Sequence, residues 1–220
     1  MKGFKEKKFK VTFLIDKNNN WIEQSLIKYK FNLEKKYSFH IQKNYKKIKN
    51  QDIVIALSYT KILPKSFLTK NHLNIVVHSS KLPRDKGFSP VFYQVLRGEN
   101  TIFLSLIEMA EKVDSGDILF QTKYKLNSSG LNEEIREKQA NATFKIIKKF
   151  LTNYPNIHRK KQIGKESFNK RRTYFSNKLN IDKTIKSQFN IMRVAHNEYY
   201  PINFNYKNKI YILKIYKKEP

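Results

Sequence analysis

The sequence predicts an α/β protein, with a mostly parallel, Rossmann-like sheet, helices on both of its faces, and a small C-terminal helix and β-hairpin. Short apolar runs without alternation are typical of strands buried on both faces, and they occur at Lys8 to Ile15, Asp52 to Leu57 and Leu73 to Val77. Apolar residues at helical spacing follow or separate these runs. The 220 residues suffice for one substantial core and a modest appendage.

The first strand leads into a predicted helix, which gives a βα unit. Its apolar residues recur at helical spacing: Trp21, Ile22, Leu26, Tyr29 and Leu33. A further short strand is expected near Phe39 to Gln42. The turn from Asp16 to Asn20 contains no glycine, so the sequence lacks the glycine-rich phosphate cradle of nucleotide-binding first loops.

A long helix is predicted from Glu133 to about Asn153, because acidic residues open it and lysines close it. The residues expected to face the sheet are Leu131, Ile135, Ala140, Phe144, Ile147 and Leu151. We predict a catalytic domain over residues 1–158, and a linker with a small extension over residues 159–220. That extension is expected to contain a helix at Ile185 to His196 and a hairpin formed by Ile202 to Tyr206 and Ile210 to Tyr216.

Composition narrows the classes of function. The chain has no cysteine, which excludes disulfides and cysteine-based metal sites, and we expect no metal cofactor. It has no apolar run of membrane-spanning length, and Met1 to Lys10 lacks a signal peptide's apolar segment, so we expect a cytoplasmic protein without a membrane partner. The net charge is +27, but 38 of the 45 cations are lysines (45 − 7) scattered over the chain. This predicts nonspecific attraction to polyanions and no specific nucleic-acid partner.

One histidine lies where a sheet of this class collects its reactive groups. The run from Leu73 ends at His78, followed by a loop, and the carboxyl ends of such strands form the crevice of an open α/β sheet. The acidic turn from Val113 to Asp117 lies 36 residues downstream (114 − 78), so a compact sheet can bring Asp114 to His78. A histidine beside a carboxylate transfers protons near neutral pH. The alternatives are a structural histidine and an ordinary turn.

The motif from His78 to Pro83, with Gly87, Pro90 and the turn at Asp114, resembles the signature of the folate-dependent N-formyltransferases, which share the methionyl-tRNA formyltransferase fold. This resemblance implies 10-formyltetrahydrofolate as formyl donor and an amine as acceptor. It implies that His78 stabilises the developing oxyanion and that Asp114 orients His78 and accepts a proton. The segment from Ser58 to Pro64 is similar to the family's pteridine loop. The implied folate-binding residues are Tyr59, Ile62, Leu63, Pro64, Val113 and Asp114.

The C-terminal segment extends the resemblance. The motifs beginning at Arg171, Ile181, Phe189 and Tyr200 look like those of formyltransferases that act on nucleotide-linked amino sugars. About one hairpin follows Pro201, which is little for a tRNA-binding domain, so a nucleotide-sugar acceptor is expected. The implied acceptor-binding residues are Ser80, Lys81 and Arg193. Methionyl-tRNA, glycinamide ribonucleotide and a non-catalytic folate-binding role remain the alternatives, and the glycine-free turn counts against glycinamide ribonucleotide.

Two positions depart from the family pattern. An asparagine normally precedes the histidine by two residues and polarises the formyl oxygen, but Val76 stands there. Asn74 is on the same strand face, roughly 13 Å from His78 at about 3.3 Å per residue. Ser80, a backbone N–H or His78 itself is expected to take over this role. Tyr174-Phe175-Ser176 replaces a proline with acidic residues, which leaves acceptor specificity open.

The predicted hairpin is apolar enough to cover a surface. Its residues include Ile210, Tyr211, Ile212, Leu213 and Ile215. A homodimer formed through this hairpin is therefore an expectation of the sequence.

Overall fold

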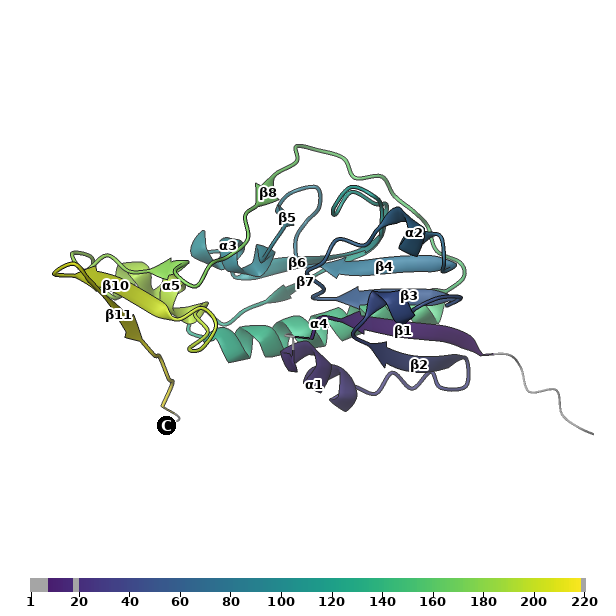
Figure 1. Cartoon of the computed structure of the whole chain (residues 1–220), viewed down its shortest axis with the longest axis horizontal. Helices are drawn as coiled ribbons and strands as arrows, with labels where there is room; N and C mark the ends of the chain where they lie inside the picture. The colour runs from purple at the N-terminus through teal and green to yellow at the C-terminus, as the bar shows by residue number, and fades with distance from the viewer. Residues whose placement is uncertain (1–7, 18–19, 219–220) are drawn as a thin grey trace, which may run out of the picture.

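A six-stranded sheet forms the centre of the molecule in the computed structural model, which describes residues 8–17 and 20–218. Its strands lie in the order β2-β1-β3-β4-β6-β7 (Figure 1). Their bounds are β1 (Phe9–Ile15), β2 (Tyr37–Gln42), β3 (Ile53–Leu57), β4 (Leu73–His78), β6 (Thr101–Glu108) and β7 (Ile118–Lys125). The first four pair in parallel, and β6 and β7 add antiparallel partners at one edge. The predicted α/β class with a mostly parallel sheet is confirmed.

Helices cover both faces of the sheet, which explains the continuous apolar strands. On one face, α1 (Asn20–Lys28) and the long α4 (Asn132–Asn153) pack on the main core. The short α2 (Lys65–Leu68) and the 3-10 turn η1 (Tyr45–Lys47) cover the other face, where Phe67 packs against Leu14 and Val54. α3 (Pro90–Leu96) packs in a third cluster beside the N-terminal end of α4. All five residues of β3 are buried because both faces are covered.

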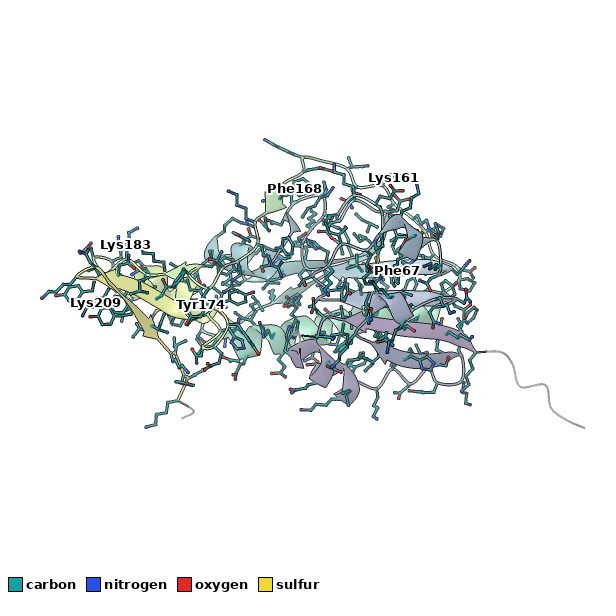
Figure 2. The ribbon with its side chains drawn as sticks, viewed as in Figure 1. Phe67, Lys161, Phe168, Tyr174, Lys183 and Lys209 are labelled. Atoms are coloured by element: carbon teal, nitrogen blue, oxygen red, sulfur yellow. The ribbon has the colours of Figure 1, made fainter. Side chains whose placement is uncertain are left out.

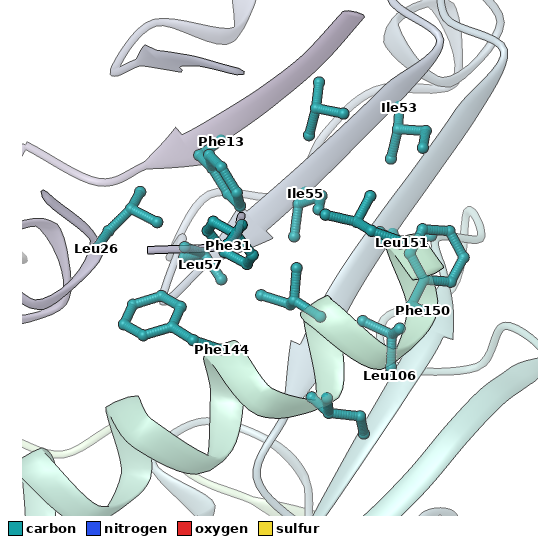
Figure 3. Close-up of a cluster of buried hydrophobic side chains, with 14 of the residues drawn as sticks. Phe13, Leu26, Phe31, Ile53, Ile55, Leu57, Leu106, Phe144, Phe150 and Leu151 are labelled. Carbon is teal, nitrogen blue, oxygen red and sulfur yellow. The ribbon is translucent and has the colours of Figure 1, made fainter. Parts of the chain in front are cut away.

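Aromatic and aliphatic side chains from α4 fill the main core (Figure 3). Phe144, Phe150 and Leu151 point from the helix toward the sheet, where they meet residues such as Phe13 and Ile55. Each of these five side chains is at most 2% exposed, and burying one such side chain stabilises a fold by about 1.5–3 kcal/mol. Of the predicted sheet-facing residues, five from Ile135 to Leu151 are buried and Leu131 is half-buried at the N-cap.

Two predicted elements are shorter than the periodicity indicated. α1 ends at Lys28, so Leu33 lies in the following turn, although Tyr29 and Leu33 still pack on the core. Asn32 has φ of 56°, a left-handed conformation that takes the chain off the helical path. In the hairpin, β11 (Lys209–Leu213) ends before Tyr216.

The C-terminal part forms a small unit beside the sheet (Figure 1). Its elements are β9 (Asn177–Lys178), η2 (Lys186–Gln188), α5 (Phe189–Arg193), β10 (Ile202–Tyr206) and β11. The hairpin turn holds Lys207 and Asn208 at φ of 46° and 60°, as two-residue hairpin turns of the primed type require. The predicted hairpin is therefore present, whereas the helix predicted over Ile185 to His196 is reduced to η2 and the five residues of α5.

The segment between these parts is not a free linker. Residues 160–169, here called the strap, run back across the sheet domain (Figure 2 labels Lys161 and Phe168 on it). The strap begins with a bridge between Lys160 and Ile118, and ends at β8 (Phe168–Asn169), which pairs in parallel with β5 (Lys86–Gly87). The Lys86 side chain is 1% exposed, and its Nζ lies 2.5 Å from Glu166 Oε1. The domain boundary at residue 158 stays a prediction.

Within residues 8–17 and 20–218, every helix is too short or too polar to cross a membrane. The glycine-free turn from Asp16 to Asn20 includes residues 18–19, which lie outside the described residues.

Candidate active site

His78 is the last residue of β4, and the structure brings it to Asp114 as the spacing predicted. Nδ1 of His78 lies 3.4 Å from Oδ2 of Asp114, and the two side chains are 8% and 11% exposed. The surrounding protein therefore excludes most water from the pair, which strengthens the electrostatic interaction between them.

Asp114 reaches His78 by a route that the parallel-sheet pattern does not describe. β6 runs antiparallel to β4, so the chain leaves β6 near the start of β4, where the N–H of Met109 donates to the carbonyl of Asn74. The loop at residues 109–117 then runs back along β4 to bring Asp114 to the opposite end. The return is tight at Gly116, where a Cβ atom would lie 1.7 Å from the Glu108 carbonyl oxygen.

Three contacts hold Asp114 in place. The N–H of Gly87 donates to Asp114 Oδ2 at 2.8 Å, so the short strand β5 anchors the carboxylate. Gln162, on the strap, donates through Nε2 to the carbonyls of Asp114 and Gly116, both at 2.8 Å. Asp114 itself has φ of 51°, a left-handed conformation that these contacts stabilise.

The second ring nitrogen of His78 is held by the main chain. Nε2 lies 2.7 Å from the carbonyl oxygen of Asp85. A carbonyl only accepts hydrogen bonds, so Nε2 carries a proton in every state that keeps this contact. Nδ1 is therefore the ring atom that can gain or lose a proton, and it is the atom that faces Asp114.

Three hydrogen bonds hold Asp85 in place. Its carboxylate accepts from both terminal nitrogens of Arg97, at 3.1 and 2.7 Å, and its N–H donates to Ser167 Oγ on the strap at 2.8 Å. Asp85 has φ of 56°. Sequence reasoning missed Asp85 and Arg97 because they act on His78 through a backbone carbonyl, whose direction has no signature in residue identity.

A cavity of about 410 Å³ opens at the His78–Asp114 pair, within the size range of small-molecule sites. The predicted folate residues Tyr59, Ile62, Leu63 and Val113 line it with His78 and Asp114. Pro64, the N-cap of α2, is not among the residues that line it. Ile62 is 72% exposed and Val113 is 40% exposed, so these apolar side chains of the cavity lining are accessible to a ligand.

A second group of residues in the cavity lining is aromatic and cationic. They are Trp21, Phe92, Arg136, Arg172 and Tyr200. The guanidinium of Arg172 lies between two rings, with its carbon 4.0 Å from the centre of Phe92 and 4.3 Å from that of Tyr200. Arg136 lies over Trp21 at 5.4 Å. The sequence contains these residues in five distant segments, so only the fold reveals the group.

The three predicted acceptor-binding residues lie away from the cavity. Ser80 is fully buried, and its hydroxyl donates to the carbonyl of Arg84 at 2.7 Å. Lys81 is exposed over the Phe103 ring. Arg193 is 1% exposed, and its guanidinium donates to Gly130 and Asn127 carbonyls and to the Asn100 side chain. Each of these side chains contacts other protein groups, and none of the three is among the residues that line the cavity.

Val76 lines the cavity where the family pattern has asparagine. Asn74 does not take its place, because its amide nitrogen donates to the Leu68 carbonyl and its oxygen accepts from Asn71. The cavity lining includes one side-chain amide that contacts the neighbour of His78: Gln139 of α4 donates to Ser79 Oγ at 2.9 Å. Sequence reasoning did not select Gln139.

Within the part of the chain that the structure describes, histidine, aspartate and glutamate side chains form no group of three that could hold a metal ion. A buried histidine–carboxylate pair at a strand end, with a cavity open to both residues, defines the site of an α/β protein equipped for proton transfer.

The chain belongs to the formyl transferase family, whose model matches residues 4–151, about two thirds of the chain. Membership of this family agrees with the resemblance found in the His78 and Asp114 motifs.

Named relatives fall into two groups. The chain is 32% identical over 109 residues to methionyl-tRNA formyltransferase of Rickettsia felis, a match that covers 49% of this chain and 36% of that protein. The match therefore spans well under two thirds of the relative's length. A solved methionyl-tRNA formyltransferase from Clostridium thermocellum has a TM-score of 0.78 at 23% identity, over 93% of this chain and 96% of that chain. A sugar N-formyltransferase from a Shewanella species has a TM-score of 0.69 at 16% identity, over 96% and 99%.

Proposed function

We propose that this protein transfers the formyl group of 10-formyltetrahydrofolate to the amine of a nucleotide-linked amino sugar. The observation that carries the proposal is the lining of one cavity. The His78–Asp114 pair lines it together with exposed apolar side chains, arginines and aromatic rings. Apolar walls suit a flat folate, and arginines suit an anionic acceptor.

The residues present fit the donor. Tyr59, Leu63 and Val113 supply apolar walls for a pteridine, and the loop that follows β3 leaves backbone groups at its edge. When bound, 10-formyltetrahydrofolate supplies the formyl carbon that the acceptor amine attacks. The amine nitrogen gains a bond to this carbon, the folate nitrogen loses its bond, and the proton released by the amine ends on the folate nitrogen.

The catalytic roles follow from the tautomer of His78. Nε2 stays protonated on the Asp85 carbonyl, which fixes the ring and leaves Nδ1 for the reacting groups. Nδ1–H stabilises the negative charge that develops on the formyl oxygen, an effect worth about 3–4 kcal/mol for a single well-placed donor. Oδ2 of Asp114 accepts the proton from the amine, while the Gly87 N–H keeps the carboxylate in position.

A second acceptor is favoured by different observations. The chain carries a net charge of +27, and its matched sequence relatives include methionyl-tRNA formyltransferases. Methionyl-tRNA is therefore the alternative acceptor, and both candidates present an anionic group next to an amine. The fold is shared with sugar N-formyltransferases and methionyl-tRNA formyltransferases alike, so the acceptor has to be identified by assay.

The test incubates the protein with 10-formyltetrahydrofolate and either a panel of nucleotide-linked amino sugars or methionyl-tRNA. Released tetrahydrofolate and the mass of each acceptor are followed together. A gain of one formyl group on an amino sugar, with equimolar tetrahydrofolate, supports the proposal. Formylation of methionyl-tRNA alone contradicts the sugar acceptor and selects the alternative.

We also propose that the protein forms a homodimer through its C-terminal hairpin. β11 is an edge strand, and all five of its residues are exposed, among them Ile210, Ile212 and Leu213 at 41–55% exposure. An exposed apolar edge strand is a favourable surface for a second copy. Light scattering should give the mass of a dimer for the natural sequence and of a monomer for Ile212→Lys. A monomer for both proteins would contradict this proposal.

A further inference from the structure

Helix α4 connects the arginines of the cavity lining to the His78–Asp114 pair. Gln139 donates to the hydroxyl of Ser79, the residue that follows His78. Arg136 precedes Gln139 by three residues, which is about 4.5 Å along a helix at about 1.5 Å per residue. Residues three apart lie on one helix face, so Arg136 and Gln139 share a face of α4, and both line the cavity.

Arg172 comes from the segment that follows the strap and is held rigidly. The rings of Phe92 and Tyr200 flank its guanidinium, and Nη2 donates to Asn177 Oδ1 and the Val194 carbonyl, both at 3.2 Å. Nε is buried and has no hydrogen-bond acceptor among the residues that the structure describes. A buried donor without a partner is costly, so this guanidinium is fixed in place with hydrogen-bonding capacity unused.

No carboxylate among the described residues forms an ion pair with Arg136 or Arg172, whereas the exposed Arg97 pairs with two carboxylates and the exposed Arg159 with one. Exposed Glu133 attracts Arg136 only weakly. Burial lowers the pKa of Arg136, and it lowers the pKa of Arg172 to about 10, with the positive charge of Arg136 adding to the effect on Arg172. Both groups stay charged at neutral pH, and neither has an ion-pair partner among the described residues, although the carboxylates of Glu111 and Asp114 also line the cavity.

We propose that Arg136 and Arg172 form an anion subsite that binds the phosphate groups of the acceptor while its amine lies at His78 and Asp114. This inference rests on the proposed function and specifies how the acceptor is recognised. Two guanidinium groups match a diphosphate in charge, and Arg136 can add the geometry of paired hydrogen bonds. Phe92, Tyr200 and Trp21 provide flat surfaces around the subsite for the rest of the acceptor.

Trp21 makes the subsite measurable without turnover. It is the one tryptophan in the sequence, and the Arg136 guanidinium lies over its ring. Inorganic pyrophosphate is titrated into the protein while tryptophan fluorescence is recorded, in the absence of folate and amine. A saturable change is expected for the natural sequence, and the double variant Arg136→Gln, Arg172→Gln should bind pyrophosphate at least tenfold more weakly. Removing one hydrogen-bonded charge costs about that factor or more.

A matched control distinguishes pyrophosphate binding at the subsite from a general effect of net charge. Lys138 on α4 and Lys178 on β9 are exposed and do not line the cavity. Lys138→Gln with Lys178→Gln lowers the net charge by the same two units, from +27 to +25 (27 − 2). This control should bind pyrophosphate as the natural protein does. Arg136→Lys with Arg172→Lys, which keeps the charge and loses the paired geometry, should bind with intermediate affinity.

Tetrahydrofolate binding checks the fold of each variant, because other residues are predicted to bind the folate. All variants should retain tetrahydrofolate binding. Equal pyrophosphate affinity in the natural protein and the Arg136, Arg172 double variant would overturn the anion subsite. Equal loss in the lysine control would overturn it as well. Either result leaves the formyl transfer assay unaffected, and formyl transfer confined to uncharged amines would overturn the proposed acceptor independently of this titration.

Discussion

Gly87 connects the strap to the catalytic carboxylate, and Gly87→Ala tests this connection. Its N–H donates to Asp114 Oδ2 at 2.8 Å, and its φ is 87°. A Cβ at this position would lie 2.8 Å from the Asn169 carbonyl oxygen in β8. An alanine therefore has to shift β5 away from the strap, and the shift moves the N–H that holds Asp114.

Gly98 provides the control because it isolates the conformational cost. Its φ is 82°, and a Cβ there would meet one side-chain atom at 4.0 Å. The left-handed conformation costs an alanine about 1–2 kcal/mol at either site. Gly87→Ala also disturbs the pairing of β5 with β8, which adds about 1 kcal/mol for a weakened hydrogen bond. We therefore expect losses of about 2–3 kcal/mol for Gly87→Ala and about 1–2 kcal/mol for Gly98→Ala.

Activity should separate the two variants more sharply than stability. A hydrogen bond to a charged group contributes about 1.5–3 kcal/mol, so losing the Gly87 contact should lower kcat by roughly tenfold or more. Urea unfolding gives the stabilities, and formyl transfer at saturating donor and acceptor gives kcat. Gly98→Ala should keep kcat. Equal kcat in both variants would refute the role of Gly87 in holding Asp114.

Three further predictions follow from the same contacts. His78→Asn and Asp114→Asn should each lower turnover by about 10²–10⁴-fold with little change in unfolding, and near-natural turnover in both would contradict their assignment. Lys86 holds the pKa of Glu166 below its ordinary value, so Glu166 contributes stability above about pH 4.5, and this contribution disappears as pH falls through the lower folded-state pKa. Glu166→Gln should therefore destabilise the protein at pH 7 and not at pH 3, as measured by urea unfolding; an equal loss at both pH values would count against the ion pair. The hydroxyl of Tyr124 is buried without a hydrogen-bond partner, so Tyr124→Phe should leave the melting temperature unchanged or higher, and a marked fall would show that the hydroxyl has a partner.

The strands and the long helix were predictable because burial dictates their patterns. A strand covered on both faces, such as β3, needs apolar residues throughout, and α4 needs them at helical spacing. The pairing of His78 with Asp114 was predictable from their spacing and the motif. Its path was not, because residues 109–117 return along β4 from an antiparallel strand, and strand direction leaves no mark on the pattern of apolar residues.

The supporting groups of the site escaped prediction for a related reason. Asp85 acts through its carbonyl and Gly87 acts through its N–H, so the role of neither residue can be predicted from its side chain. Arg136 and Arg172 come from α4 and from the segment after the strap, and only tertiary packing places them together. Ser80 and Arg193 were expected to face the acceptor, but protein groups use their hydrogen bonds.

The most direct test of the account is a single-turnover experiment with 10-formyltetrahydrofolate and a nucleotide-linked amino sugar, comparing the natural protein with His78→Asn. The account predicts one formylated sugar for each tetrahydrofolate released by the natural protein, and loss of both products in the variant, which should still bind the folate. Formylated sugar formed at the same rate by His78→Asn would contradict the central claim that the His78–Asp114 pair performs the transfer.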